Sequence, residues 1–262
     1  YYDYAGFRCN DYFGGNLRGI EQKLPYIKSL GVTHIYLNPI FESAENHRYS
    51  TSDYMSVDPY LGDSADFISL CKKAAEYDIK IILDGVFSHT GDDSIYFNKY
   101  GHYPPNGAYN SKKSPYYSWY SFTDYPDSYD CWWGFKTLPN VKETEQGYTE
   151  FITGKNGVLR HWMRLGASGW RLDVADELPD EFLDKVRSAV KAENPQAPII
   201  GEVWENAVKK CSYGAQRRFL SGAQCDSVMN YPFANAICSF MKNGDAQKFY
   251  ESVMEIINDY PA

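Results

Sequence analysis

The sequence predicts an α/β fold: a (β/α)8 TIM barrel, incomplete in this chain, with a small domain inserted after the third barrel strand. Short β-branched apolar runs alternate with amphipathic segments of helical period, the pattern of a parallel sheet with crossover helices. One run, IKIILDGV at residues 79–86, is almost continuously apolar, as in a strand buried on both faces. Five such strands are recognisable in 262 residues, whereas a complete barrel has eight.

The elements follow in order along the chain. Apolar residues at helical spacing predict a first helix over residues 17–30, which Gly31 ends as a C-terminal cap. A strand over 32–37, a helix with Phe67, Leu70, Cys71 and Ala74 on its apolar face, and the strand over 79–86 come next. The same reasoning predicts a helix over 149–165, a strand over 168–174, a helix over 179–193, strands over 198–203 and 226–229, and two helices that end before Pro261.

A long irregular stretch, residues 90–147, interrupts this alternation. It is rich in Tyr, Trp, Pro, Ser and Asp and shows no period. A structureless loop of this length is improbable in a compact domain, so we interpret the stretch as a small subdomain that covers a site. The predicted limits are 1–91 and 148–262 for the partial barrel and 92–147 for the inserted, domain B-like segment. The first barrel strand is expected to precede Tyr1 and the last two to follow Ala262, so the chain is expected to be part of a longer protein.

Composition narrows the possible partners. The net charge of −8 argues against a nucleic-acid partner. No apolar run is long enough to cross a membrane, so no membrane partner is expected. The six cysteines are scattered and lack zinc-site spacing, which predicts free thiols, several of them buried, and favours the cytoplasm without establishing a location. The many aromatic residues (24 Tyr, 14 Phe and 6 Trp) are only a weak indication of a carbohydrate ligand.

Three predicted strands end in polar side chains. In a barrel the active site lies at the carboxyl ends of the strands, so these side chains are candidates for chemistry. They come from three segments: IILDGVFSH, with Asp84 and His89; GWRLDVADE, with Arg171, Asp173, Asp176 and Glu177; and IIGEVWE, with Glu202, Trp204 and Glu205. Taken singly, an aspartate here is more often a helix cap or salt-bridge partner, and His89 more often a satisfied loop histidine. Trp204 or Tyr49 alone is more often a packing residue. Three strand ends with polar side chains on the same rim of the barrel favour an active site.

Two of these carboxyl groups have contrasting predicted environments. Arg171 and Asp173 are two apart in one strand and point to the same side, so the arginine is expected to lower the pKa of Asp173 and keep it ionised. Glu202 lies among apolar residues, which is expected to raise its pKa, as suits a proton donor. Such a pair is typical of glycoside hydrolysis. The spacing of neighbouring strands, about 4.8 Å, suits the carboxyl separation of about 5–5.5 Å found in retaining enzymes.

The chain resembles the α-amylase family, glycoside hydrolase family 13, and within it the neopullulanase/cyclomaltodextrinase group. The similarity covers essentially the whole length and seven segments in order. These are YFGGNLRGI (12–20), GVTHIYLNPIF (31–41), HRYSTSDYMSVDPYLG (47–62), DGVFSH with GWRLDVADE and GEVWE, and DSVMNYPF (226–233). Leu138–Pro139–Asn140 stands where the family has a short motif at the end of its inserted domain.

The resemblance implies a role for each matching residue. Asp173 is the nucleophile and Glu202 the general acid/base. Arg171 holds the nucleophile, His89 hydrogen-bonds the sugar, and Asp84 organises this network. Tyr49 stacks on the same sugar, Trp204 and Glu177 lie toward the leaving group, and His47 belongs to the substrate-binding set. The implied activity is retaining hydrolysis of α-1,4 bonds, with α-1,6 bonds as a further possibility, in maltooligosaccharides, pullulan, cyclodextrin or starch-type substrates.

The chain also departs from the family pattern. A seventh-strand motif with His and Asp is absent before Ala262, so this chain alone is expected to be nearly inactive. Ser50, Ser88 and Glu205 replace an Asp, an Asn and a His common in relatives, which affects the expected specificity. No cofactor and no metal are expected, although calcium is conceivable in a longer protein. An α-glucan transglycosylase and a noncatalytic carbohydrate-binding member are the alternatives. Unpaired strand edges predict a homo-oligomer.

Overall fold

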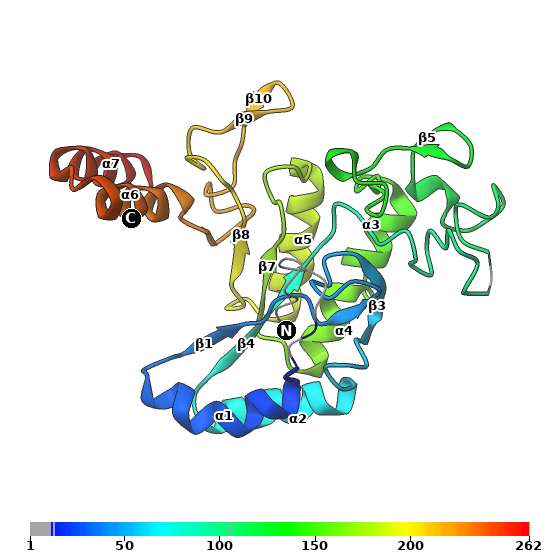
Figure 1. The fold of residues 1–262 in the computed structure, drawn as a ribbon, viewed down its shortest axis with the longest axis horizontal. Helices are drawn as coiled ribbons and strands as arrows, with labels where there is room; N and C mark the ends of the chain where they lie inside the picture. Colours follow the sequence, from blue (N-terminus) through cyan, green and yellow to red (C-terminus); the bar gives the residue numbers. More distant parts are fainter. Residues whose placement is uncertain (1–11, 13, 105, 262) are drawn as a thin grey trace, which may run out of the picture.

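A computed structural model describes residue 12 and residues 14–104 and 106–261 (Figure 1). Its centre is a five-stranded sheet in the order β1-β4-β7-β8-β11, and every neighbouring pair is parallel. The strands are β1 (His34–Tyr36), β4 (Lys80–Gly85), β7 (Gly169–Leu172), β8 (Ile199–Gly201) and β11 (Ser227–Val228). All five coincide with predicted strands, and their order in the sheet follows the chain. The α/β fold with the parallel arc of a barrel is therefore confirmed.

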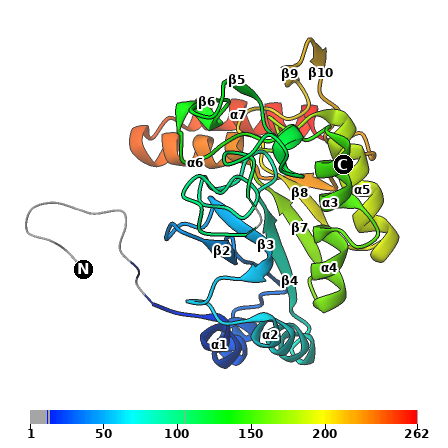
Figure 2. The ribbon, with the colours of Figure 1, turned by 90° about the vertical axis from the view of Figure 1, so that its right-hand side faces the viewer.

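Helices alternate with the strands of the sheet along the chain, as predicted. They are α1 (Leu17–Ser29), α2 (Ser64–Glu76), α3 (Gln146–Thr153), α4 (Val158–Leu165), α5 (Asp180–Glu193), α6 (Tyr231–Asn243) and α7 (Ala246–Asp259). The side chains of Asn16 and Asp63 cap α1 and α2 by accepting a backbone N–H of the first turn. Figure 2 shows α1 beside α2 below the sheet, and α4 beside α5 to the right of it. This arrangement leaves the carboxyl ends of the strands free to carry a site.

The prediction of one helix over residues 149–165 is wrong, because α3 and α4 are separate. Gly154 and Gly157 lie at the break. A Cβ on Gly157 would approach the carbonyl oxygens of Phe151 and Ile152 to 2.7 and 2.8 Å. The backbone is packed so closely at Gly157 that a side chain there would clash. Because the apolar period continues through the break, the sequence pattern did not reveal it.

Three small antiparallel hairpins were not predicted. One joins β2 (Phe41–Ser43) to β3 (Thr51–Val57), with register shifts that obscure the alternation. A second, β5 (Phe122–Asp124) with β6 (Ser128–Tyr129), lies in the irregular stretch, which also holds the single turns η1 (Tyr117–Trp119) and η2 (Trp132–Gly134). The third is β9 (Cys211–Ser212) with β10 (Ala215–Gln216). The limits 92–147 for an inserted domain stay a prediction.

Cys71, Cys131, Cys211, Cys225 and Cys238 are free thiols, of which only Cys225 is buried, so the expectation of several buried thiols is wrong for the described cysteines. Cys9 lies outside the described residues. Within the described part of the chain, no helix combines the length and the apolar character needed to cross a membrane.

Candidate active site

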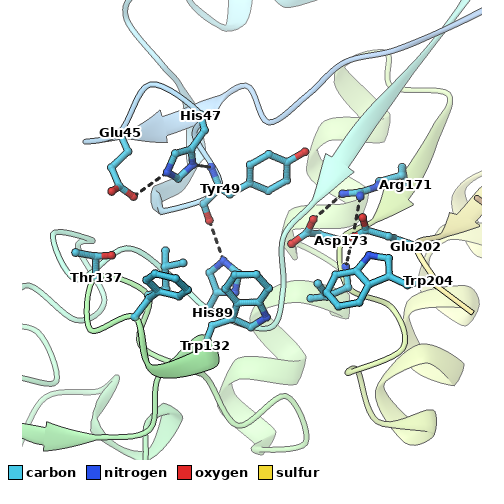
Figure 3. A pocket seen from close by; sticks show the side chains of 13 residues that line it. Glu45, His47, Tyr49, His89, Trp132, Thr137, Arg171, Asp173, Glu202 and Trp204 are labelled. Carbon is cyan, nitrogen blue, oxygen red and sulfur yellow. Dashed lines mark hydrogen bonds and ion pairs between the residues drawn. The ribbon is translucent and has the colours of Figure 1, made fainter. Parts of the chain in front are cut away.

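The strand register brings the predicted polar residues together at one edge of the sheet. Asp84 of β4 lies directly opposite Arg171 of β7. The ladder then continues past the strand ends, where the Asp173 N–H donates to Gly85 O at 3.0 Å and the Glu202 N–H donates to Leu172 O at 2.9 Å. The carboxyl ends of three neighbouring strands therefore supply Asp84, Asp173 and Glu202 to one place. Figure 3 shows Asp173 and Glu202 beside Arg171.

A single guanidinium holds all three carboxylates. Arg171 Nη1 is 2.9 Å from Asp84 Oδ1 and 2.7 Å from Asp173 Oδ1, and Nη2 is 2.9 Å from Glu202 Oε2. All four side chains are buried. Asp173 and Glu202, from adjacent strands, thus converge as their positions in the sequence predicted, and they share one cation, a contact that was not predicted for Glu202.

Strained backbone supports the Glu202 carboxylate. Val174 adopts a φ of 39°, which is a genuine outlier for a β-branched residue, and its N–H donates to Glu202 Oε2 at 2.9 Å. The Tyr231 hydroxyl, from the start of α6, donates to the other oxygen, Oε1, at 2.7 Å. Glu202 is therefore held in its charged form by three donors, counting Arg171.

The pKa directions of the pair are the reverse of those predicted. Burial raises the pKa of Asp173 to about 7, and the negative charge of Asp84 adds to this effect, although Arg171 opposes it. Burial also acts to raise the pKa of Glu202, but the Val174 N–H, the Tyr231 hydroxyl and Arg171 together outweigh it and bring that pKa below its ordinary value. The sequence predicted the contact between Arg171 and Asp173, but it predicted neither the effect of Asp84 on the pKa of Asp173 nor the donors to Glu202.

Asp173 and Glu202 line the floor of a pocket of about 480 Å³, a volume in the range of small-molecule sites, whereas Asp84 reaches it only through Arg171. Of the predicted residues, His47, Tyr49, His89, Arg171, Asp173, Glu202 and Trp204 line this pocket. The irregular stretch adds four residues that sequence reasoning did not single out for the site: Trp132, Phe135, Thr137 and Leu138. The pocket wall is therefore largely aromatic above an acidic floor.

The histidines of the pocket have defined tautomers. His47 Nδ1 accepts from the Tyr49 N–H at 3.0 Å, so its Nε2 carries the hydrogen that faces Glu45 Oε2 at 3.2 Å. His89 Nε2 donates to the Tyr49 carbonyl at 3.1 Å, and its Nδ1 accepts from the Ser88 hydroxyl at 2.8 Å. Burial lowers the pKa of His89 to about 4, so this ring is neutral at pH 7.

Asp84 organises its surroundings in a way that includes one unpredicted partner. It accepts hydrogen bonds from the Tyr49 hydroxyl at 3.2 Å and from the Tyr36 hydroxyl of β1. Tyr36 also lies against Arg171, whose Cζ is 5.7 Å from the ring centroid. The signal for Tyr36 was its place near the end of a predicted strand, on the same rim as the other residues.

Besides Asp84, Glu177 is a predicted site residue that does not line the pocket. Its carboxylate accepts from two indoles, Trp132 Nε1 at 2.9 Å and Trp133 Nε1 at 2.8 Å. A direct contact between Glu177 and substrate stays a prediction. Among the described residues, no group of three or more His, Cys, Asp or Glu side chains is placed to hold a metal ion.

Comparison with known proteins agrees with this geometry. A family model described as the α-amylase catalytic domain matches residues 5–260. The chain is 42% identical over 287 residues to an amylopullulanase of Thermoanaerobacterium saccharolyticum, covering 98% of this chain and 22% of that protein. It is 36% identical to neopullulanase 2 of Thermoactinomyces vulgaris, over 92% of this chain and 40% of that protein.

A solved structure is similar over most of the chain. The cyclic α-maltosyl-(1→6)-maltose hydrolase of Arthrobacter globiformis superposes with a TM-score of 0.84 at 30% identity, over 97% of this chain and 55% of that one. The chain thus spans between 22% and 55% of the length of these relatives. With the family model matched almost from end to end, the chain belongs to the α-amylase family of glycosidases, glycoside hydrolase family 13.

Proposed function

We propose that this chain supplies the catalytic floor of a retaining α-glucan hydrolase, with Asp173 as nucleophile and Glu202 as general acid/base. The observation that carries the proposal is the shared guanidinium of Arg171, which brings both carboxylates to one pocket floor. The proposed substrates contain α-1,4 glucosidic bonds: maltooligosaccharides, pullulan, cyclodextrin or starch. Names of relatives that include pullulan-cleaving enzymes and a hydrolase of an α-(1→6)-linked cyclic sugar extend the proposal to α-1,6 bonds.

The reaction proceeds in two steps. An Asp173 oxygen attacks the anomeric carbon while Glu202 gives its proton to the departing glycosidic oxygen, which leaves as a hydroxyl on the released sugar. Water then attacks the same carbon, Glu202 takes a proton from that water, and Asp173 departs as a carboxylate. Configuration is retained because the anomeric carbon inverts twice.

The titrations of Asp173 and Glu202 are coupled, so the proton that is donated in the first step is shared between these two carboxyl groups. The pKa of Asp173 is about 7 and that of Glu202 is lowered, so near neutral pH the coupled acids hold about half a proton between them on average. The reaction requires that proton on Glu202 once the sugar is bound. We propose that a bound sugar, by excluding water, raises the pKa of Glu202, whereas Arg171 keeps Asp173 ionised beside the anomeric carbon.

The nucleophile is tested by trapping it in the protein at its full natural length. A 2-deoxy-2-fluoro maltosyl fluoride is expected to label Asp173, and peptide mass spectrometry locates the label. In a separate hydrolysis of a maltooligosaccharide, the first product seen by NMR is expected to be the α-anomer. Label on another residue, no label, or a β-anomer overturns the assignment. Products longer than the starting oligosaccharide indicate transfer rather than hydrolysis.

The acid/base is tested with a matched pair of substitutions on one rim. Glu202→Gln is expected to lower kcat on maltooligosaccharides by about 10³, in the range that general acid–base catalysis contributes. Glu205→Gln alters an exposed acid that is paired with Lys210 and is expected to change kcat by less than about twofold. Equal losses in both variants contradict the role of Glu202.

A further inference from the structure

The tryptophan pair of the η2 turn has a feature that packing does not explain. Trp133 adopts a left-handed backbone conformation, with φ 49° and ψ 27°, which is unfavourable for a bulky residue. Its side chain is nevertheless 66% exposed, and the nearby Phe135 is 56% exposed. A strained backbone that presents a large apolar ring to solvent gains nothing from core packing.

The ring of Trp133 is fixed in place even though it is exposed. Its centroid lies 5.3 Å from that of Trp132 in a stacked arrangement and 5.5 Å from that of Trp204 in a perpendicular one. Glu177 accepts from both indoles of the turn, with one carboxylate oxygen for each. Because the N–H of Trp133 is already bonded, its ring offers an apolar surface in a defined orientation.

This surface continues the wall of the pocket. Trp132 and Trp204 line the pocket itself, and Trp133 touches both from outside it. Trp204 follows Glu202 by two residues, and Glu202 is the proposed proton donor to the leaving group. Trp133 therefore lies on the leaving-group side, one ring farther from the reacting bond than Trp204.

We propose that Trp133 is a stacking platform for a glucose unit beyond the pocket on the leaving-group side, and that Glu177 is its positioning residue. This inference rests on the proposed function and deepens it, because it assigns preference for longer linear α-glucans to one side chain. The C–H face of a glucose ring packs on the exposed indole, as apolar ligand faces pack on rigid aromatic rings.

The test compares maltooligosaccharides of three to seven units in the natural full-length protein. Trp133→Ala is expected to raise KM for the seven-unit sugar about tenfold with kcat nearly unchanged, since the platform binds substrate and transition state alike. It is expected to leave the three-unit sugar within twofold, and Trp133→Phe is expected to be intermediate. Tyr26→Ala, which removes another exposed aromatic ring, on α1 and outside the pocket, serves as the control.

Glu177 is tested for its separate role. Glu177→Ala is expected to reproduce the length dependence of Trp133→Ala although Trp133 is intact, because the indole is no longer held. A loss that is equal for the three-unit and seven-unit sugars assigns Glu177 to direct substrate binding instead and overturns its positioning role. The same loss at every length in Trp133→Ala, or none for the seven-unit sugar, overturns the platform.

Binding measurements distinguish a failure of the platform proposal from a failure of the proposed function. Calorimetric titration of maltoheptaose into Glu202→Gln and into the double variant Glu202→Gln/Trp133→Ala needs no turnover. About tenfold weaker binding in the double variant supports the platform, and equal affinity overturns it. Absence of turnover in the unsubstituted protein contradicts the proposed function alone.

Discussion

At the scale of single residues, the pKa values of Asp173 and Glu202 depend on how many charged and hydrogen-bonding groups lie close together in the candidate active site. Local sequence predicted that Arg171 touches Asp173, because residues two apart in a strand share a side, and this contact is present at 2.7 Å. The direction of the Asp173 pKa could not be predicted, since it depends on burial and on Asp84, 89 positions earlier than Asp173 in the chain. The donors to Glu202 were equally hidden, because Tyr231 lies 29 positions away.

The two acids are expected to affect stability in opposite directions. An unfolded Asp has a pKa of about 3.9. Folded Asp173 has a pKa of about 7, so between these values the folded state binds more protons and stability falls as pH rises. Asp173→Asn removes this penalty and is expected to raise Tm at pH 8 by about 3 °C or more, with little effect at pH 4.

Glu202 provides the matched control for that measurement. Its folded pKa is lowered, so its ionised form stabilises the protein above the unfolded pKa of about 4.3, and that contribution is lost as pH falls. Glu202→Gln is therefore expected to lower Tm at pH 8. Calorimetric scans at both pH values check the pair, and a Tm loss at pH 8 in both variants contradicts the dominance of burial at Asp173.

At the scale of elements, the hydrophobic period of the sequence predicted the strands of the sheet but not the short hairpins or the fold of the irregular stretch. All five sheet strands were predicted because each is an apolar run bounded by turn residues. The β9–β10 hairpin was not predicted, because its segments, Cys211–Ser212 and Ala215–Gln216, show neither an apolar run nor a period. The pocket residues Trp132 and Phe135 were missed for the same reason, since they belong to an irregular stretch whose folding depends on contacts made elsewhere.

The role of Gly157 in the break between α3 and α4 can be tested by substitution. Gly157→Ala places a Cβ against two backbone carbonyls that cannot move without displacing the end of α3. We expect a loss of about 2 kcal/mol in the free energy of unfolding, measured with urea. Gly19→Ala in α1 is the control, because its Cβ meets only Asn16 Oδ1 at 3.4 Å and is expected to be neutral or stabilising by up to about 1 kcal/mol. Unchanged stability in Gly157→Ala indicates that the break has another cause.

At the scale of the whole molecule, the described sheet has two open edges. Within the described residues, β1 pairs only with β4 and β11 only with β8. The last two helices pack on each other but expose apolar side chains such as Met241 and Ile257. Unpaired strand edges and uncovered apolar faces both favour contact with other chains.

These open surfaces give a prediction about association. A polypeptide of these 262 residues alone is expected to form dimers or larger species at micromolar concentration. Multi-angle light scattering measures the mass directly, and Met241→Lys on α6 is expected to shift the distribution toward smaller species. A monodisperse monomer in the unsubstituted polypeptide contradicts the prediction.

The single guanidinium beneath three acids has a consequence for any molecule that enters the pocket. With every carboxyl ionised, Asp84, Asp173, Glu202 and Arg171 sum to two negative charges, in surroundings too dry to dissipate them. A neutral sugar does little to relieve that imbalance, whereas positive charge developing at its anomeric carbon relieves it at once. The same electrostatic field that makes Asp173 costly to ionise is thus poised to favour an oxocarbenium-like state over the resting substrate.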